Sequence, residues 1–405
     1  MNLSGLARAL NSGGRVITRT GIPLVRLDED LLLEDARRRT GLDDFGDSGF
    51  REPFRRLLAS YEREASLNLI GRIAARQGSI RLLENRLRME ADRRRHPEIG
   101  AGDVRQPIFV TGLPRTGTTL LHGLFAQDPA NRAPLNWEML FPSPPPERAK
   151  FHHDQRIAWA ERQLRWFQRL NPEFRKIHPV EARLPEECLI ITSHAFLSFQ
   201  FQTMYDVPSY QAWLEEQDLR PSYAQHRRFL QHLQWHCRGE RWVLKAPAHL
   251  FGLKALFDVY PDARVILTHR DPLEVVPSLA SLHTTLRRTF RDEVDPIATA
   301  ADATRRWAKG ITRALHDRDA GCGRPEQYLD VRYTDLVRDP IGTVRRIYAH
   351  FDLPYGEAAQ RRMRQFLATH PKDRHGRHQY SMAQFGLDPD EERARYQTYR
   401  ARFEL

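Results

Sequence analysis

Residues 107–125 read PIFVTGLPRTGTTLLHGLF, and this stretch decides the fold of the chain. An apolar run at 108–111 ends in a glycine-containing turn, and apolar residues then resume at helical spacing from about Gly117. A buried strand, a glycine-containing loop and a helix in this order are typical of a loop that binds phosphate through backbone N–H groups and the helix N-terminus. Such loops usually carry a lysine at the position of Thr118, whereas the cation here is Arg115.

Three further apolar runs, at 242–245, 263–269 and 328–333, read as strands, and a helical pattern follows each of them. Strands that alternate with helices indicate a parallel sheet with helices on both faces. The expected fold class is therefore α/β, a P-loop-like three-layer fold with a central parallel sheet. Helical additions are expected before the sheet and within it.

The domain organisation follows from where helical patterns run without strands. Residues 27–95 repeat apolar positions every three to four residues, and the polar connector 96–107 separates them from the first strand. The predicted divisions are an N-terminal helical accessory region at 1–100, an α/β core at 101–385 with a helical insertion at about 147–240, and a C-terminal helix at 386–405.

Composition limits the classes of protein that the chain can belong to. The 405 residues include 28% charged residues with a net charge of +11, and no apolar run is long enough to span a membrane. The excess charge indicates either an anionic partner or an arginine-rich solvated surface, and basic runs that mix signs favour the second reading. The tract RWFQRLNPEFRK (165–176) has the basic and aromatic character of a nucleic-acid binder, but its spacing predicts an amphipathic helix near the core. Three distant cysteines fit a reducing compartment, so we expect a cytoplasmic location.

A second candidate anion site lies at the end of the strand predicted at 263–269. Arg270 follows this strand, Asp271 and Pro272 suit the start of a helix, and Ser278 lies two turns into it. Open α/β sheets bind ligands at the carboxyl ends of their strands. Two anion sites at two strand ends suit a nucleotide that is phosphorylated at two places.

Together, PRTGTTLLHGLF and VILTHRDPLEVVPSL resemble two motifs of the sulfotransferase superfamily. The donor of that family is 3′-phosphoadenosine 5′-phosphosulfate (PAPS). The spacing between the motifs resembles the bacterial branch related to tyrosylprotein sulfotransferases, and the resemblance covers roughly residues 105–385. It implies a sulfotransferase that uses PAPS as co-substrate and needs no metal.

The resemblance also assigns roles to matching positions. The residues implied to hold the 5′-phosphosulfate are Arg115, Thr116, Gly117, Thr118 and Thr119. Arg270 and Ser278 are implied to hold the 3′-phosphate, with Tyr333 near the nucleotide. Lys245, together with Arg115, is implied to approach the transferring group. Ser381, and with it Arg377 or Tyr380, belongs to a late segment that is implied to close over the donor.

The acceptor hydroxyl needs a base, and the sequence leaves several candidates open. Family relatives often use a glutamate after the loop, which places Glu138 of LNWEML in that role. His249 stands near Lys245 but out of register with the histidine of cytosolic relatives. Glu186 and Glu187 are further candidates, although two acidic residues there also suit the start of a helix.

The predicted function is in-line transfer of a sulfuryl group from PAPS to the hydroxyl of a small acceptor, with a carboxylate as general base. The aromatic stretch 193–213 is expected to line the acceptor pocket, which favours an apolar or aromatic acceptor. We expect neither nucleic acid as a partner nor stable membrane insertion. The alternatives are a P-loop small-molecule kinase and a non-catalytic nucleotide-binding or nucleic-acid-associated protein.

Overall fold

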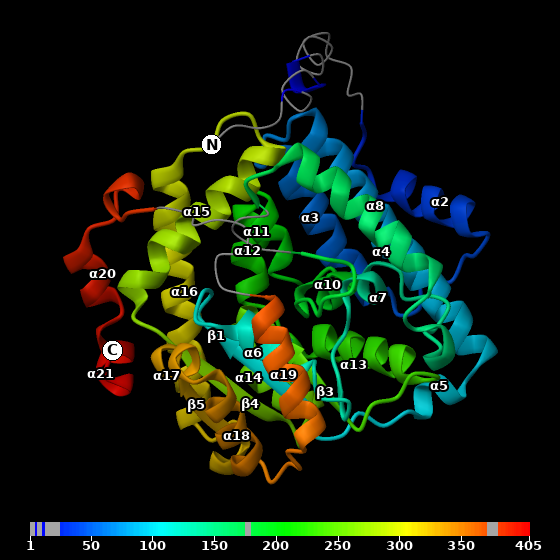
Figure 1. The fold of residues 1–405 in the computed structure, drawn as a ribbon. Coiled ribbons are helices and arrows are strands. Elements are labelled where there is room, and N and C mark those ends of the chain that lie inside the picture. The colour runs from blue at the N-terminus through cyan, green and yellow to red at the C-terminus, as the bar shows by residue number, and fades with distance from the viewer. Residues whose placement is uncertain (1–4, 6–9, 13–24, 175–179, 371–379) are drawn as a thin grey trace.

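The computed structural model describes residues 5, 10–12, 25–174, 180–370 and 380–405. A five-stranded parallel sheet forms the centre, and helices pack on both of its faces (Figure 1). The predicted α/β fold class is therefore confirmed. In the described part of the chain, no helix is both long and apolar enough to cross a membrane.

Four of the five strands lie where the apolar runs predict them. The strands are β1 (Ile108–Gly112), β2 (Asn131–Arg132), β3 (Arg241–Lys245), β4 (Arg264–His269) and β5 (Tyr328–Arg332). Strand β2 was not predicted, because two residues are too few to show an alternating pattern. It pairs with the start of β3 and widens the sheet at one edge.

The order of the strands brings the candidate site residues to one edge of the sheet. The order is β2-β3-β1-β4-β5, so β1 lies between β3 and β4. Gly112 of β1 pairs with Thr268 of β4, and Val110 pairs with Lys245 of β3. Because all strands are parallel, their carboxyl ends share one edge, where ligands of such sheets bind. The loops after β1, β3 and β4 therefore meet.

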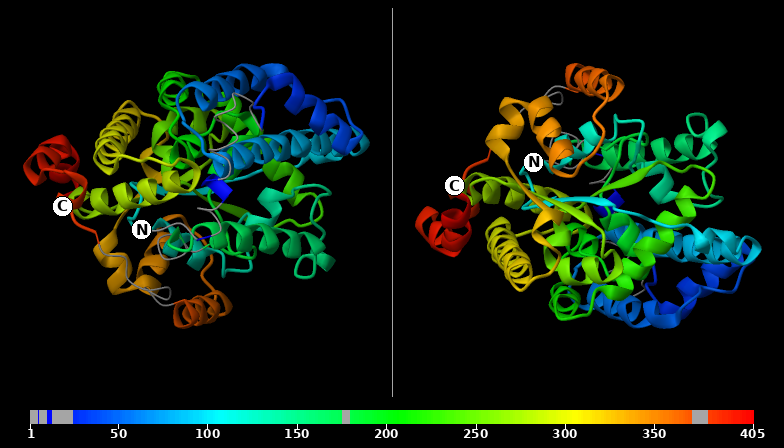
Figure 2. Two further views of the ribbon diagram at one scale, coloured as in Figure 1. Left: turned by 90° about the horizontal axis from the view of Figure 1, so that it is seen from above. Right: turned by 90° about the horizontal axis from the view of Figure 1, so that it is seen from below.

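Each face of the sheet is covered by its own set of helices, which gives three layers (Figure 2). On one face, Val110, Ile266 and Val331 pack beneath α6 (Thr118–Phe125), α17 (Tyr333–Arg338), α18 (Pro340–His350) and α19 (Glu357–Thr369). On the other face, Phe109 and Val265 pack against α13 (Arg220–Gln234), α14 (Leu253–Val259), α15 (Pro272–Phe290) and α16 (Pro296–Asp319). Successive side chains of β1 therefore point to opposite faces of the sheet and pack in two separate apolar cores.

The N-terminal helices pack on the side of the sheet that Phe109 and Val265 face. They are α2 (Glu29–Thr40), α3 (Arg51–Arg63) and α4 (Leu69–Arg95). Leu83 and Leu87 of α4 are buried in the same apolar cluster as Phe109 of β1. The ring centroid of Phe54 in α3 lies 4.4 Å from that of Phe196. The predicted boundary between accessory region and core stays a prediction, although the two share one apolar cluster.

The C-terminal residues 386–405 were expected to form one helix and instead form two short ones. These are α20 (Pro389–Arg395) and α21 (Gln397–Phe403). Between them Tyr396 is buried, and its hydroxyl donates to the carbonyl of Thr304 at 2.9 Å. This contact with α16 anchors the chain where the helix breaks.

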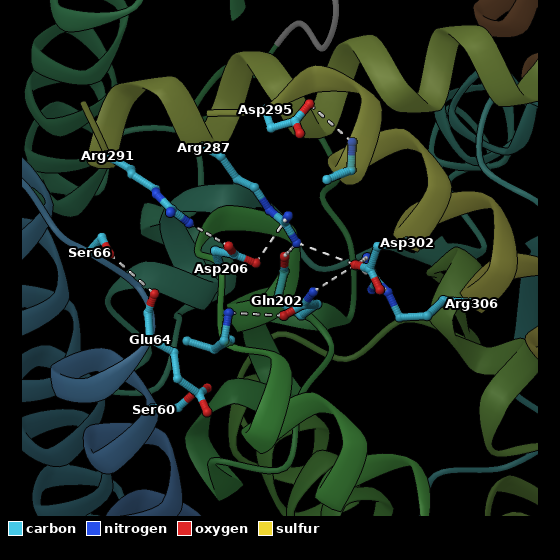
Figure 3. Close-up of polar contacts among 12 residues, drawn as sticks. Ser60, Glu64, Ser66, Gln202, Asp206, Arg287, Arg291, Asp295, Asp302 and Arg306 are labelled. Carbon is cyan, nitrogen blue, oxygen red and sulfur yellow. Dashed lines mark hydrogen bonds and ion pairs between the residues drawn. The ribbon is translucent and has the colours of Figure 1, made fainter. Parts of the chain in front are cut away.

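A group of largely buried ionic side chains joins the segment around Gln202 to α15 and α16 (Figure 3). Arg287 is 4% exposed, and its guanidinium lies 3.2 Å from Asp206 and 3.7 Å from Asp302. The amide of Gln202 donates to Asp302 at 3.2 Å. Buried charges must be paired to be tolerated, so Arg287 depends on both carboxylates.

We predict that Arg287→Ala lowers the free energy of unfolding by about 2–3 kcal/mol, because two carboxylates lose a buried charged partner. The loss stays moderate since Arg291 and Arg306 still contact these carboxylates. Denaturant unfolding measures it. The matched control is Arg305→Ala, which removes an exposed arginine from the same Asp302 and should change stability by less than about 0.5 kcal/mol. Equal losses in the two variants would contradict the assigned role of burial.

Candidate active site

The loop between β1 and α6 has a backbone that its glycines make possible. Gly112 has φ 144°, and a Cβ there would lie 2.4 Å from the carbonyl oxygen of Thr268. Gly117 has φ 90°, and a Cβ there would lie 2.8 Å from Leu336 and 3.2 Å from the ring of Tyr333. Both positions therefore exclude a side chain on steric as well as conformational grounds.

Thr116 holds the loop against the neighbouring strand. Its hydroxyl is fully buried, donates to the carbonyl of Leu113 at 2.6 Å and lies 2.6 Å from the hydroxyl of Thr268. The single proton of the hydroxyl is used by the carbonyl of Leu113, so the hydroxyl has none to donate to an anionic ligand. Of the groups that Thr116 offers a phosphate, only its backbone N–H fits the predicted role.

The first turn of α6 is built to receive an anion. Gly117 is the N-cap, and no side chain of the described residues caps the helix there. The first N–H groups of a helix lack internal partners, and the helix dipole adds a partial positive charge at the same point. Thr118 is buried and Thr119 is exposed. The N–H groups of this turn and the hydroxyl of Thr119 can therefore bind a phosphate or sulfate group.

The two predicted anion motifs meet in the structure. The Nε of Arg115 donates to the hydroxyl of Ser278 at 3.1 Å, so the loop touches α15. A guanidinium N–H of Arg270 donates to the backbone carbonyl of Arg115 at 3.1 Å. Arg115 has φ 68°, an uncommon value for a residue with a side chain, and this turns its carbonyl toward Arg270. Two arginines and a serine from separate segments thus converge.

Tyr333 forms one wall of this cluster. It is the first residue of α17, directly after β5, and its ring packs against Gly117. The guanidinium of Arg270 lies 4.3 Å from the centre of that ring, and Glu274 pairs with Arg270 at 2.9 Å. The aromatic face and the carboxylate hold Arg270 in place beside the loop.

Lys245 lies at the end of β3 and pairs with a glutamate. Its side chain is 1% exposed, and its Nζ lies 2.7 Å from Oε1 of Glu187 and 3.4 Å from the hydroxyl of Thr119. The backbone N–H of Cys188 donates to the carbonyl of Lys245 at 2.8 Å, which fixes the segment of Glu187 to the end of the strand. A carboxylate and an ammonium group therefore lie together beside the first turn of α6.

Glu138, the first candidate for the base, lies elsewhere and is fully buried. Both of its carboxylate oxygens bind the guanidinium of Arg132, with Oε2 at 2.9 Å, and Oε2 also accepts from the N–H of Leu135 at 3.0 Å. Arg132 itself lies over the ring of Trp242 at 5.0 Å. A carboxylate held on both oxygens and closed to solvent is unsuited to take a proton from an acceptor. The geometry therefore disfavours the predicted role of Glu138, whose contacts stabilise the start of α7 (Asn136–Leu140).

His249, the runner-up, is buried on the opposite face of the sheet from α6. Its Nδ1 lies 2.8 Å from the hydroxyl of Tyr223, and its ring packs edge-on against Phe109 at 5.0 Å. Burial, with the nearby His226 and Lys245, lowers the pKa of His249 well below its usual value. Its place among core aromatic residues gives it a packing role.

The late segment is only partly described. Ser381 is exposed, and its hydroxyl accepts from the N–H of Gln384 at 3.3 Å. Tyr380 lies near Arg115 and partly offsets the effect of burial, which lowers the pKa of Arg115. Arg377 lies outside the described residues. The predicted closure of Ser381 over the donor stays a prediction.

Aromatic side chains of the stretch 193–213 are buried in the apolar core, and its predicted part in an acceptor pocket stays a prediction. Phe196 is fully buried, Phe199 stacks on Phe251 at 4.4 Å, and the hydroxyl of Tyr210 donates to the carbonyl of Phe196 at 2.6 Å. These rings belong to the apolar core. The burial of these rings contributes to the packing of the core. Among the residues described, no group of three or more His, Cys, Asp or Glu side chains could hold a metal ion.

Residues 107–357 match the Sulfotransferase family. A curated relative, omega-hydroxy-beta-dihydromenaquinone-9 sulfotransferase Stf3 of Mycobacterium tuberculosis, is 31% identical over 285 residues. The match covers 65% of this chain and 67% of the relative, and the protein of the same name in Mycobacterium bovis matches equally.

Two solved structures are similar over nearly the whole chain. Sulfotransferase STF1 of Mycobacterium tuberculosis is 34% identical with a TM-score of 0.82, and the match covers 91% of this chain and 98% of that one. Sulfotransferase STF9 of Mycobacterium avium is 28% identical with a TM-score of 0.85, covering 95% and 98%. The relation to tyrosylprotein sulfotransferases stays a prediction.

The sequence resemblance implies that this loop binds the 5′-phosphosulfate of PAPS. We therefore predict that Gly117→Ala weakens binding of the related nucleotide adenosine 3′,5′-bisphosphate at least tenfold, since the new methyl group would meet Leu336 and Tyr333 and disturb the first turn of α6. Isothermal titration calorimetry measures the affinity. Gly321→Ala is the matched control, because Gly321 also has a positive φ, of 84°, but open space around it. It should lose stability by a similar strain and bind the nucleotide normally. Equal loss of affinity in both variants would show that the loop geometry is unimportant.

Proposed function

Since the chain belongs to the Sulfotransferase family, we propose that it transfers a sulfuryl group from PAPS to a hydroxyl of a small, apolar or aromatic acceptor. The observation that carries the proposal is the meeting of Arg115, Ser278 and Arg270 beside the first turn of α6. Two cationic side chains and one helix N-terminus suit a donor that carries anionic groups at two places.

The donor fits the residues that line the loop. The N–H groups after Gly117 and the hydroxyl of Thr119 would bind the 5′-phosphosulfate, and no side chain from Gly112 or Gly117 obstructs them. Arg270 and Ser278 would bind the 3′-phosphate. Tyr333 would lie beside the adenosine, where it already fixes the guanidinium of Arg270.

The chemistry is an in-line displacement. The bond between sulfur and the bridging oxygen of the donor breaks as the bond from the acceptor oxygen to sulfur forms, and negative charge gathers on the departing phosphate. Cations and N–H groups aimed at that phosphate lower the barrier, and one such donor is worth about 3–4 kcal/mol. Lys245 and Arg115 are the cations that we assign to this task. With them in place the reaction requires no metal.

We assign the general base to Glu187. Its side chain is 19% exposed, and its carboxylate pairs with Lys245, whose Nζ lies 3.4 Å from the hydroxyl of Thr119. The acceptor proton would pass to Glu187 as its oxygen attacks sulfur. Glu138 has no such access, because Arg132 and the N–H of Leu135 occupy both of its oxygens.

The apolar nature of the acceptor is supported by a relative. The matching mycobacterial sulfotransferase is named for a hydroxylated dihydromenaquinone, which is an apolar molecule with a hydroxyl group. The sequence identity of 31% over 285 residues makes an acceptor of this class the best proposal for this chain. Transfer of labelled sulfate from PAPS to hydroxylated isoprenoids and to simple phenols tests it directly.

We predict that Arg270→Ala weakens binding of adenosine 3′,5′-bisphosphate about tenfold to hundredfold, the worth of one charge-assisted hydrogen bond. Binding of AMP, which lacks the 3′-phosphate, should change little. Calorimetric titration with both nucleotides separates the two effects. If the variant loses affinity for both nucleotides by the same factor, Arg270 does not bind the 3′-phosphate.

We predict that Glu187→Gln lowers kcat by about 10²–10⁴-fold while the donor still binds, because the amide accepts no proton. Glu138→Gln is the matched control and should act on stability instead. It leaves Arg132 buried without a carboxylate, which costs about 3–5 kcal/mol of unfolding free energy. Single-turnover kinetics and thermal denaturation of both variants measure the difference. Normal turnover in Glu187→Gln would refute the assignment of the base.

A further inference from the structure

One face of helix α8 (Gln155–Leu170) exposes large aromatic side chains to solvent. Trp159 is 43% exposed and Trp166 is 52% exposed. Arg162 and Arg169 are also exposed, and the four residues follow one another at intervals of three and four. This spacing places them on a single side of the helix. We call Trp159, Arg162, Arg165, Trp166 and Arg169 the α8 surface.

The opposite face of α8 is firmly packed, so the tryptophans are not exposed by a loose helix. Ile157 and Ala160 are buried in an apolar cluster with Trp137. The ring of Phe167 stacks on that of Phe290 at 6.2 Å. After the last turn, the amide of Asn171 donates to the hydroxyl of Thr289 at 2.6 Å. The tract 165–176 was predicted to form an amphipathic helix near the core, and Phe167 and Phe174, whose ring centroids lie 5.1 Å apart, pack on its inner side while Trp166 is exposed.

The charge of the α8 surface is positive. Its three arginines lie among the tryptophans, and the guanidinium of Arg169 lies 5.8 Å from the ring of Trp166. Arg165 is 57% exposed and forms a weak ion pair with Glu161 at 3.6 Å. A helix that carries tryptophan and arginine on its outer side is typical of helices that lie in the interface of an anionic bilayer. There the indole rings enter the headgroup region and the guanidinium groups bind lipid phosphates.

We propose that the α8 surface binds an anionic lipid bilayer and that the enzyme takes its apolar acceptor from there. The second half of this inference rests on the proposed function. Contacts connect the α8 surface to the segment that leads to the active site. The amide of Gln168 in α8 donates to the carbonyl of Val180 at 3.3 Å, and Ala182 packs with Ile157 and Ala160. The same segment continues to Glu187, the base that we assign, seven residues after the carbonyl of Val180 that α8 contacts.

The expected strength follows from charge. Each arginine near an anionic bilayer strengthens binding about fivefold, so replacing two by glutamate weakens it at least about 25-fold. The test variant is Arg162→Glu with Arg165→Glu in the full chain. The matched control is Arg338→Glu with Arg361→Glu, which makes the same charge change at side chains that are 80% and 72% exposed on α17 and α19.

The experiment is co-sedimentation with vesicles of phosphatidylglycerol and phosphatidylcholine in equal parts, and with vesicles of phosphatidylcholine alone. We expect the wild-type chain to bind the anionic vesicles at least tenfold more tightly, with a loss at high salt. The α8 variant should lose this binding while the control keeps it. A second variant, Trp159→Ala with Trp166→Ala, should lose binding to both kinds of vesicle. Equal binding by all variants, or equal loss in variant and control, would overturn the proposal.

Two further measurements separate this proposal from its rivals. Loss of polynucleotide binding in the α8 variant, with vesicle binding intact, would assign the surface to nucleic acid and overturn the proposal. Transfer to a water-soluble phenol should be the same in the α8 variant and the wild type, whereas transfer to a hydroxylated isoprenoid embedded in anionic vesicles should fall. Vesicle binding without sulfuryl transfer to any acceptor would uphold the surface and refute the proposed function.

Discussion

The close approach of the loop to strand β4 is the constraint on which the rest of the site depends. Gly112 pairs with Thr268, and the hydroxyls of Thr268 and Thr116 are in contact. A side chain at Gly112 would push β1 away from β4, and loss of the Thr116 hydroxyl would remove a contact that holds the loop against β4. Because they are held together, Arg115 reaches Ser278 and Arg270 reaches the carbonyl of Arg115. Anion binding at this edge is therefore a property of two strands rather than of one loop.

Two glutamates of similar sequence surroundings show how environment decides what a carboxylate does. A proline lies four residues before Glu138 and two residues before Glu187. Glu138 binds Arg132 in a closed, apolar setting, where an ion pair stabilises local structure. Glu187 binds Lys245 at the margin of the site and keeps partial access to solvent. The same pairing of opposite charges thus gives a structural contact in one case and a candidate proton acceptor in the other.

The sequence was most informative where a pattern is local. The apolar runs predicted β1, β3, β4 and β5, and the glycine and proline positions predicted the turns between strand and helix. It was least informative where the outcome depends on which side chains the fold brings into contact. Nothing near Glu138 signals that Arg132 will enclose it, and aromatic residues such as Phe196 read alike whether they line a pocket or fill a core. Strand β2 was not predicted, because its two residues form a strand only through pairing with β3 and show no pattern of their own.

The hydrogen bond from the guanidinium of Arg270 to the carbonyl of Arg115 joins residues that lie 155 positions apart in the chain. The loop emerges early during synthesis, but the strand that shapes it and the arginine that closes it emerge much later. Contacts of such long range form slowly, because the chain between their ends must first be ordered. The anion site is thus assembled late in folding, and nascent chains that end before β4 carry the whole glycine-rich motif without the means to use it.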